Sequence, residues 1–220
     1  AMASAVTVAA AAISFPIAYF MARHASPALK GFFYVGVMLP MWASYIVKAY
    51  SWTVILAKGG ILYWVLGKLH LAGAMDAFLR MPYVGGSTLS TSNFGRFLVF
   101  TYLWLPFMIL PIQAALERVP PSLLQASADL GANAAQTFRH VTWPLAFPGV
   151  VAGSIFTFSL TLGDYIIPQI VGTSRLFIGQ AVYTQQGTAG NIPLAAAFTM
   201  VPILIMGLYL WAARRAGAFD

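Results

Sequence analysis

Five long apolar segments, separated by more polar connections, run along the chain. A helix needs about 20 mainly apolar residues to cross a bilayer, and these segments are long enough for that. The pattern predicts an all-α fold, a polytopic transmembrane helix bundle that forms a single transmembrane domain over residues 1–220. The predicted spans are residues 1–22, 31–57, 97–116, 145–171 and 192–213.

Two of these spans contain residues that disturb a regular helix. Pro40 is expected to kink the second span, which a membrane helix tolerates when neighbours satisfy the freed carbonyl. Gly163-Asp164 and Pro168 are expected to interrupt the fourth span. Small residues in the fourth span are expected to let another helix approach closely, and they are Gly149, Ala152 and Gly153.

The connections between spans differ in composition. Residues 61–71 are apolar but too short to span, and we predict an interfacial helix with Trp64 at headgroup depth. Residues 82–93 are rich in Gly, Ser and Thr and are predicted to be irregular. Residues 172–191 are predicted to form a loop with no more than one amphipathic turn.

The connection over residues 117–144, here called the elbow, carries the signals of two short helices. Ser122 followed three residues later by Gln125 has the form of a capping box, in which each side chain satisfies a backbone N–H at the helix start. Leu130-Gly131 is expected to end this first helix, because glycine adopts the left-handed turn without a Cβ clash.

A second cap follows the bend in the elbow. Asn133 with Gln136 predicts the start of another helix, which is expected to end before Pro144. A helix–glycine–helix shape on the aqueous side of a membrane protein is suited to docking into another protein. The alternative is a structured loop with no partner.

Composition supports the membrane prediction. Of the 220 residues, 60% are hydrophobic and only 8% are charged, whereas soluble domains are about 45–50% apolar and about 25% charged. The net charge of +7 comes from twelve dispersed basic residues, which does not indicate nucleic-acid binding. The chain has no cysteine, which excludes disulfides and thiolate chemistry.

The basic residues do not decide the orientation in the membrane. The positive-inside rule places Lys and Arg in cytoplasmic loops, but the two sides carry similar numbers. The elbow side has Arg23, Lys30, Arg118, Arg139, Arg214 and Arg215. The other side has Lys58, Lys68, Arg80, Arg96 and Arg175, and Lys48 lies within the second span.

Residues for catalysis or metal binding are not evident. His24, His70 and His140 lack the spacing of metal ligands, and Gly85-Gly86-Ser87 lacks the Lys that completes a phosphate-binding loop. We therefore predict that the chain is not an enzyme and has no metal site. Any ATP hydrolysis then belongs to another polypeptide.

Asp164 is the most informative single residue within a span. A buried carboxylate is costly in a membrane unless it is paired or faces water. It is expected either to line a solute pathway or to satisfy backbone N–H groups at a helix break. Tyr165, Trp42 and Trp104 are further candidates for a pathway lining.

The elbow also resembles a known family. Gln125-Ala126-Ser127, Gly131 after three residues, and residues 141–144 after nine more resemble the "EAA" loop of type I binding-protein-dependent ABC importer permeases. The usual form is Glu-Ala-Ala, three residues, Gly, nine residues, Ile-x-Leu-Pro. The spacing is intact, and the departures are Gln125, Ser127, Val141 and Trp143. Residues 105–111, 148–153 and 162–168 are similar to the spermidine/putrescine branch.

The resemblance implies a transmembrane subunit of an ATP-driven importer in the bacterial inner membrane. This subunit forms half of the pathway for a small solute, with a polyamine such as spermidine or putrescine favoured. Its implied partners are a cytoplasmic ABC ATPase dimer that holds ATP and Mg²⁺, a second permease subunit and an extracytoplasmic substrate-binding protein. Family members of this branch have six spans, so a first span is expected to precede this chain.

The resemblance also implies that the elbow is the cytoplasmic loop that contacts the ATPase. The residues implied in this contact are Leu123, Leu124, Gln125, Ala126, Ser127, Ala128, Asp129, Leu130, Gly131, Phe138, Arg139 and Pro144. Gln125 can form hydrogen bonds like the usual Glu, but it lacks the charge for an ionic contact. The alternatives from other classes are an ATP-independent secondary carrier or channel subunit and a purely structural membrane subunit.

Overall fold

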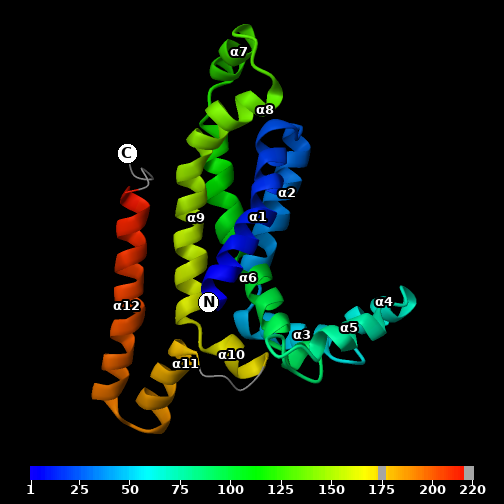
Figure 1. Cartoon of the computed structure of the whole chain (residues 1–220), viewed down its shortest axis with the longest axis vertical. Helices are drawn as coiled ribbons and strands as arrows, with labels where there is room; N and C mark the ends of the chain where they lie inside the picture. The colour runs from blue at the N-terminus through cyan, green and yellow to red at the C-terminus, as the bar shows by residue number, and fades with distance from the viewer. Residues whose placement is uncertain (173–176, 216–220) are drawn as a thin grey trace. The chain divides into compact units, whose positions relative to one another are not determined.

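The structure of the protein is a computed structural model that describes residues 1–172 and 177–215. Every regular element in these residues is helical (Figure 1). The four longest helices are α1 (Met2–Arg23), α6 (Asn93–Glu117), α9 (Trp143–Gly163) and α12 (Ile192–Arg215). The shorter α-helices are α2 (Pro27–Trp42), α3 (Tyr45–Leu56), α4 (Ile61–Lys68), α5 (Ala72–Leu79), α7 (Pro121–Asp129), α8 (Ala134–Thr137), α10 (Ile166–Ile170) and α11 (Ile178–Tyr183). Arg175, counted above among the basic residues, lies outside the described residues.

Contacts divide the chain into two compact units, each described by itself below. Unit 1 comprises Ala1–Met2, Trp42–Leu103 and Leu160–Leu204. Unit 2 comprises Ala3–Met41, Trp104–Ser159 and Ile205–Asp220. The long helices α6, α9 and α12 contribute residues to both units.

Five helical segments of the described chain are long and apolar enough to cross a membrane. They are Met2–Arg23, Tyr45–Lys68, Asn93–Glu117, Ala134–Gly163 and Ile192–Arg215, and the second of these comprises α3, α4 and the connection between them. The predicted single helix over residues 31–57 is wrong, because α2 ends at Trp42 and α3 begins at Tyr45. The break follows Pro40 by two residues, and Ser44 there has an extended backbone, with φ −54° and ψ 132°. Pro40 therefore precedes a true interruption rather than a kink.

Unit 2 has its core where α1, α6 and α9 meet. The fully or nearly fully buried apolar residues of this core are Ala10, Ala18, Met21, Met108, Ile109, Ile112, Leu116 and Ala146. Gly149 and Gly153 let α9 pack directly on α6. A Cβ on Gly153 would lie 2.7 Å from Met108 Sδ and 3.0 Å from Met108 Cα, so the close approach predicted for this span is confirmed at both glycines.

Unit 1 is held together at the start of α6 by a buried arginine. Arg96 is fully buried, and its Nε donates a hydrogen bond of 2.9 Å to the Val171 carbonyl. Its guanidinium carbon lies 4.7 Å from the Phe177 ring centroid. The Gly172 N–H donates to the Ser90 carbonyl at 2.8 Å. These contacts join α6 to the chain that follows α10.

The shorter elements differ in part from the sequence predictions. The helix expected over residues 61–71 is α4, but α5 was not predicted. Residues 82–93 are largely irregular as predicted, with one 3₁₀ turn at Leu89–Thr91. The described part of 172–191 contains α11 and a π-helical turn, Thr184–Thr188.

The fourth predicted span is interrupted as expected at Gly163-Asp164, between α9 and α10. The interruption predicted at Pro168 is wrong, because Pro168 lies inside α10. It is the third residue of this helix, where a backbone N–H has no intrahelical partner to lose.

Candidate functional site

The first helix of the elbow begins differently from the prediction. The capping box at Ser122 and Gln125 is wrong, because α7 starts at Pro121 and Pro120 is its N-cap, without a side-chain hydrogen bond. Proline suits the first helical position, since its φ is already helical and its missing N–H would be unsatisfied there anyway. Two consecutive prolines therefore set the start of α7.

The bend after α7 is a Schellman motif, as the position of Gly131 suggested. Gly131 has φ +79°, and its N–H donates to the Ala128 carbonyl at 2.8 Å. The Ala132 N–H donates to the Ser127 carbonyl at 3.1 Å. These two bonds satisfy carbonyls at the helix end and define the motif. A Cβ on Gly131 would meet no atom within 4 Å, so the requirement for glycine is conformational rather than steric.

The second helix of the elbow starts with the predicted capping box. The Gln136 N–H donates to Asn133 Oδ1 at 2.9 Å, and the Asn133 N–H donates to Gln136 Oε1 at 2.8 Å. This prediction is confirmed.

The predicted end of that helix before Pro144 is wrong. The chain passes from α8 through a π-helical segment, Phe138–Thr142, directly into α9. The Trp143 N–H bonds to the Phe138 carbonyl, five residues back. In an α-helix the ring of Pro144 would clash with the carbonyl four residues earlier. The wider π turn relieves that clash, and such turns are frequent at functional sites.

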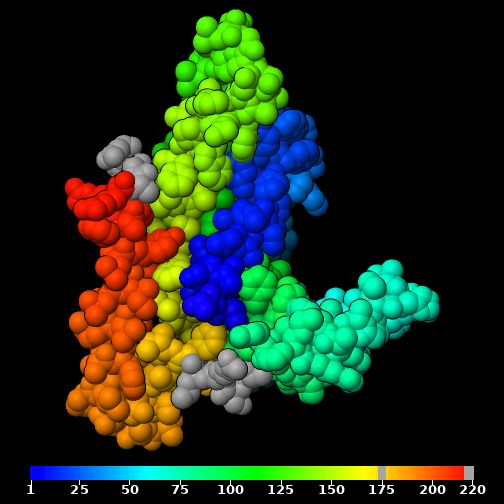
Figure 2. Space-filling view, in the orientation of Figure 1, coloured from blue at the N-terminus to red at the C-terminus, as the bar shows by residue number. Residues whose placement is uncertain are grey.

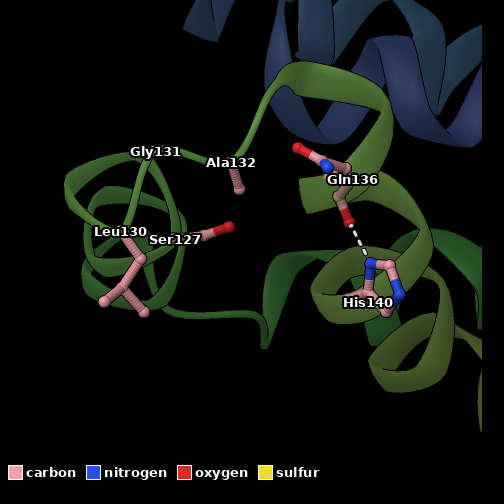
Figure 3. Close-up of a pocket in the computed structure, with 6 residues that line it drawn as sticks. All are labelled: Ser127, Leu130, Gly131, Ala132, Gln136 and His140. Carbon is pink, nitrogen blue, oxygen red and sulfur yellow. Dashed lines mark hydrogen bonds between the residues drawn. The ribbon is translucent and has the colours of Figure 1, made fainter.

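The elbow has two arms, the first formed by α7 and the second by α8 with the π-helical segment that follows it, and a small hollow lies between them. Ser127 Oγ and Thr137 Oγ1 share a hydrogen bond of 2.9 Å, which ties the arms together. The hollow has a volume of about 340 Å³ and is lined by Ser127, Leu130, Gly131, Ala132, Gln136 and His140 (Figure 3). His140 Nδ1 donates to the Gln136 carbonyl at 3.0 Å, so this ring nitrogen carries a proton.

Most of the residues implied in ATPase contact lie on the surface of unit 2. Leu130, at the end of α7, is 88% exposed. The other exposed members are Leu123, Gln125, Ala126, Ala128, Asp129, Gly131, Arg139 and Pro144, while Leu124, Ser127 and Phe138 are half-buried. On the face drawn in Figure 2, no other part of unit 2 covers α7.

A polar network anchors the first arm at the end of α6. The Arg23 guanidinium donates to the carbonyls of Leu116 at 3.0 Å and Val119 at 3.2 Å. A cation at this place also suits the negative end of the helix dipole. Glu117 pairs with Lys30, and it accepts hydrogen bonds from Gln113 Nε2 at 3.2 Å and Tyr34 Oη at 3.4 Å.

An aromatic cluster anchors the second arm to α1. The Phe138 ring makes edge contacts with Phe15, at 5.8 Å between centroids, and with Tyr19, at 6.0 Å. The Trp143 ring lies 5.3 Å from Phe15. Each such aromatic pair contributes about 0.5–1.5 kcal/mol beyond its buried area. Both ends of the elbow are thus held within unit 2, while α7 between them is exposed.

The sequence predictions missed these anchors. Arg23 and Lys30 were noted only as charges, and Phe15 and Tyr19 only as apolar residues of a span. One local signal existed, namely Phe15 and Tyr19 at i and i+4, which places both rings on one helix face. Their partner Phe138 lies more than 100 residues later, so only the tertiary structure identifies it.

Asp164 has the geometry of the helix-break alternative. Its Oδ1 accepts the N–H groups of Ile166 at 2.8 Å and Ile167 at 3.0 Å. Its Oδ2 accepts a hydrogen bond from the Tyr45 hydroxyl. The carboxylate therefore stabilises the start of α10 and ties it to α3 within unit 1.

The other pathway candidates lie in different surroundings. Tyr165 follows Asp164 and is 38% exposed, whereas Trp42 at the end of α2 is 78% exposed. Trp104 is buried in α6 and contacts the Phe107 ring at 5.8 Å between centroids. Asp164 and Tyr165 are adjacent residues of unit 1. Trp104 belongs to unit 2, and its burial there does not suit a residue that lines a solute pathway. Within the described residues, no group of three His, Cys, Asp or Glu could hold a metal ion.

Comparisons with known proteins agree with the helical architecture. A family model described as "Binding-protein-dependent transport system inner membrane component" matches residues 14–216. The inner membrane ABC transporter permease protein YdcU of Escherichia coli (strain K12) is 65% identical over 219 residues, which cover 100% of this chain and 70% of that protein. The spermidine/putrescine transport system permease protein PotB of the same organism is 28% identical over 220 residues, which cover 97% of this chain and 75% of that protein.

A solved structure has the same fold. It is a chain of a bacterial ABC transporter involved in the import of the acidic polysaccharide alginate, with a TM-score of 0.64 and 16% sequence identity. The match covers 96% of this chain and 77% of that chain.

These relatives are membrane subunits of transporters rather than enzymes, which confirms the prediction that this chain is not an enzyme. They also decide against an ATP-independent carrier or a purely structural subunit. The extent of the family match and the 65% identity both support the same family assignment. The chain belongs to the family of binding-protein-dependent transport system inner membrane components and is the permease component of an ABC importer.

Proposed function

We propose that this permease forms half of the pathway for a small aliphatic polyamine, such as spermidine or putrescine. Two observations support this substrate class: the 28% identity to permeases named for spermidine/putrescine transport, and the length of that match along the chain. A second permease subunit supplies the other half. A binding protein outside the membrane delivers the solute, and a cytoplasmic ATPase dimer binds ATP and Mg²⁺.

We propose that the elbow docks into the ATPase. The observation that carries this proposal is the contrast between an exposed α7 and its firmly held ends. Leu123 and Leu130 present apolar surface that is left uncovered in unit 2, and such surface on a folded protein marks an interaction site when it is contiguous. Asp129 and Arg139 lie at the rim, where they can make polar contacts with the partner.

The anchors give the docked elbow a mechanical role. A helix seated in a groove moves with that groove as a rigid body. The Glu117–Lys30 pair transmits the displacement to α6 and α2, and the Phe138 contacts transmit it to α1. Closure of the ATPase dimer on binding ATP then moves these helices and opens the solute pathway toward the outside of the membrane. Hydrolysis of the ATP returns the helices to their starting positions.

Gln125 changes the character of this contact relative to the usual glutamate. It is exposed on α7 and keeps hydrogen-bonding groups without a formal charge. Docking here therefore depends on shape and apolar area more than on an ion pair. A weak dependence of ATPase docking on salt concentration follows.

The experiment is reconstitution of the complete importer in proteoliposomes with its ATPase, second permease and binding protein. We expect uptake of radiolabelled putrescine or spermidine that requires ATP and the loaded binding protein. An ion gradient without ATP is the control and should support no uptake. Uptake of a different solute class by the same complex, with no polyamine uptake, would contradict the substrate proposal.

A further inference from the structure

A second hollow lies in unit 1, beside the end of α9. It has a volume of about 310 Å³ and lies between the chain around α10, α11 and the first half of α12. Figure 1 shows α11 next to the start of α12. The lining residues used below are Gly163, Tyr165, Tyr183, Gln186, Thr199 and Pro202. None of the lining residues that the structure describes is charged.

Two tyrosines form one wall of this hollow. The rings of Tyr165 and Tyr183 stack with centroids 4.6 Å apart and planes 10° from parallel. Tyr165 is 38% and Tyr183 47% exposed, so part of the aromatic surface remains open. The face of an aromatic ring is negative and attracts an ammonium group.

A glycine contact brings the two rings together. A Cβ on Gly179, in α11, would lie 2.5 Å from the Gly163 carbonyl oxygen and 2.7 Å from that of Asp164. Any larger residue would push α11 away from the end of α9. Gly179 therefore holds Tyr183 within stacking distance of Tyr165.

The local electrostatics favour a cation. Gly163 is the last residue of α9, a helix of 21 residues, and the carbonyl end of a helix carries partial negative charge. Asp164 follows directly in the chain, but its carboxylate bonds to the start of α10 and to Tyr45 and does not line the hollow. Gln186 and Thr199 offer neutral hydrogen-bonding groups, whereas a carboxylate or phosphate would find no cationic partner among the described lining residues.

We propose that this hollow, the Tyr165–Tyr183 pocket, binds a primary ammonium group carried on an alkyl chain. The ammonium lies against the tyrosine faces near the end of α9, and the alkyl chain packs toward Pro202. This proposal rests on the proposed function, because it names a place where the permease holds the same cationic solute.

The test uses a charge pair at one exposed lining position. Gln186→Glu and Gln186→Lys differ in charge at an exposed residue. Titration of the purified permease–ATPase complex with 1,4-diaminobutane, without binding protein, measures binding by calorimetry. Gln186→Glu is expected to tighten binding and Gln186→Lys to weaken it, each by about tenfold.

The aromatic wall is tested by removal and by conservative replacement. Tyr183→Leu is expected to weaken diamine binding by about tenfold, while Tyr183→Phe keeps the aromatic face and stays close to wild type. Tyr50→Leu, which changes an exposed tyrosine on α3 outside the pocket, is the matched control and should leave binding unchanged. Co-purification of the ATPase checks that each variant is assembled, and succinate, a dianion of similar length, should not bind.

The results separate this proposal from the proposed function. Diamine binding that is unaffected by all the pocket variants would overturn the pocket, while ATP-driven polyamine uptake would still support the function. A wild-type complex that neither binds nor imports any alkylamine would overturn both. Opposite effects of the two Gln186 variants, with loss in Tyr183→Leu alone among the tyrosine variants, support the pocket.

Discussion

Gly131 determines the angle of the elbow through its backbone alone. Its φ of +79° is available to glycine at little cost, and no neighbouring atom would obstruct a side chain there. Non-glycine residues in this region cost about 1–2 kcal/mol, and β-branched residues are the least tolerant. A substitution at this position therefore affects the backbone conformation of the elbow without introducing a steric clash with neighbouring atoms.

Gly131→Val is expected to leave the permease inserted in the membrane but to reduce ATPase docking. A cost of about 1–2 kcal/mol lowers the population of the bent elbow about 5–30-fold. The measurement is the amount of ATPase that co-purifies, together with ATP-dependent uptake. Gly131→Asn is the control, because asparagine adopts the left-handed conformation more readily. Full docking and uptake in Gly131→Val would refute the role of the bend.

Asp164 illustrates how one residue permits two interpretations until its neighbours are known. The sequence alone left both a pathway lining and a helix break open. Its carboxylate accepts two backbone N–H groups at the start of α10 and the Tyr45 hydroxyl. These donors offset the cost of placing a carboxylate in apolar surroundings.

At the scale of elements, the packing of α9 on α6 depends on glycine. The Cβ that Gly153 lacks would lie 3.0 Å from Met108 Cα and 3.2 Å from its carbonyl oxygen. Both are backbone atoms of a helix, which cannot move aside as a flexible side chain can. The distance between these two helices is set by this contact.

Gly153→Leu is expected to destabilise unit 2 by about 1–3 kcal/mol, the usual cost of overpacking a tight core. Thermal unfolding of the purified complex in detergent measures this change as a lower midpoint. Gly207→Leu in α12 is the matched control, because a Cβ there meets nothing within 4 Å. Equal unfolding midpoints for the two variants would show that the α6–α9 contact does not limit the stability of unit 2.

The helical connection from α8 into α9 shows where local rules fail. Pro144 predicted a helix end, yet the π turn Phe138–Thr142 carries the helix past it. The aromatic contacts of Phe138 and Trp143 with Phe15 stabilise this continuous path. Long-range packing thus outweighs a local preference against helix.

At the scale of the whole molecule, the proposed function requires the elbow to face the ATPase in the cytoplasm. The 220 residues contain no cysteine, so a thiol introduced among them reports on one chosen position when labelling is compared with that of the parent protein. Leu130→Cys is expected to react with a membrane-impermeant maleimide in inside-out vesicles and not in intact spheroplasts. Addition of the ATPase should protect it.

The control for this labelling is Leu116→Cys, which replaces a fully buried residue of the unit 2 core. It should remain unlabelled in both preparations. Reaction of Leu130→Cys in intact spheroplasts would place the elbow outside the cell and end the docking proposal.

Much of the fold was predictable from apolar patterning and helix punctuation. Length and apolarity indicated the long helices. The predictions of the Asn133–Gln136 cap and of the Gly131 bend were also correct, because a cap and a glycine bend depend on neighbours within a few residues. The break between α2 and α3, the helix α5 and the start of α7 at Pro121 were missed. In each case several local patterns were compatible with the chain, and the sequence offered no means to choose.

The sequence by itself determined that the chain is helical, apolar enough for a membrane and equipped with a bent, polar elbow, since each property follows from composition or short-range backbone preference. Only the tertiary structure decided which residues hold that elbow, how Asp164 is satisfied and that Tyr165 meets Tyr183. Such contacts join residues far apart in the chain, and their energy depends on distance in space rather than on separation in sequence.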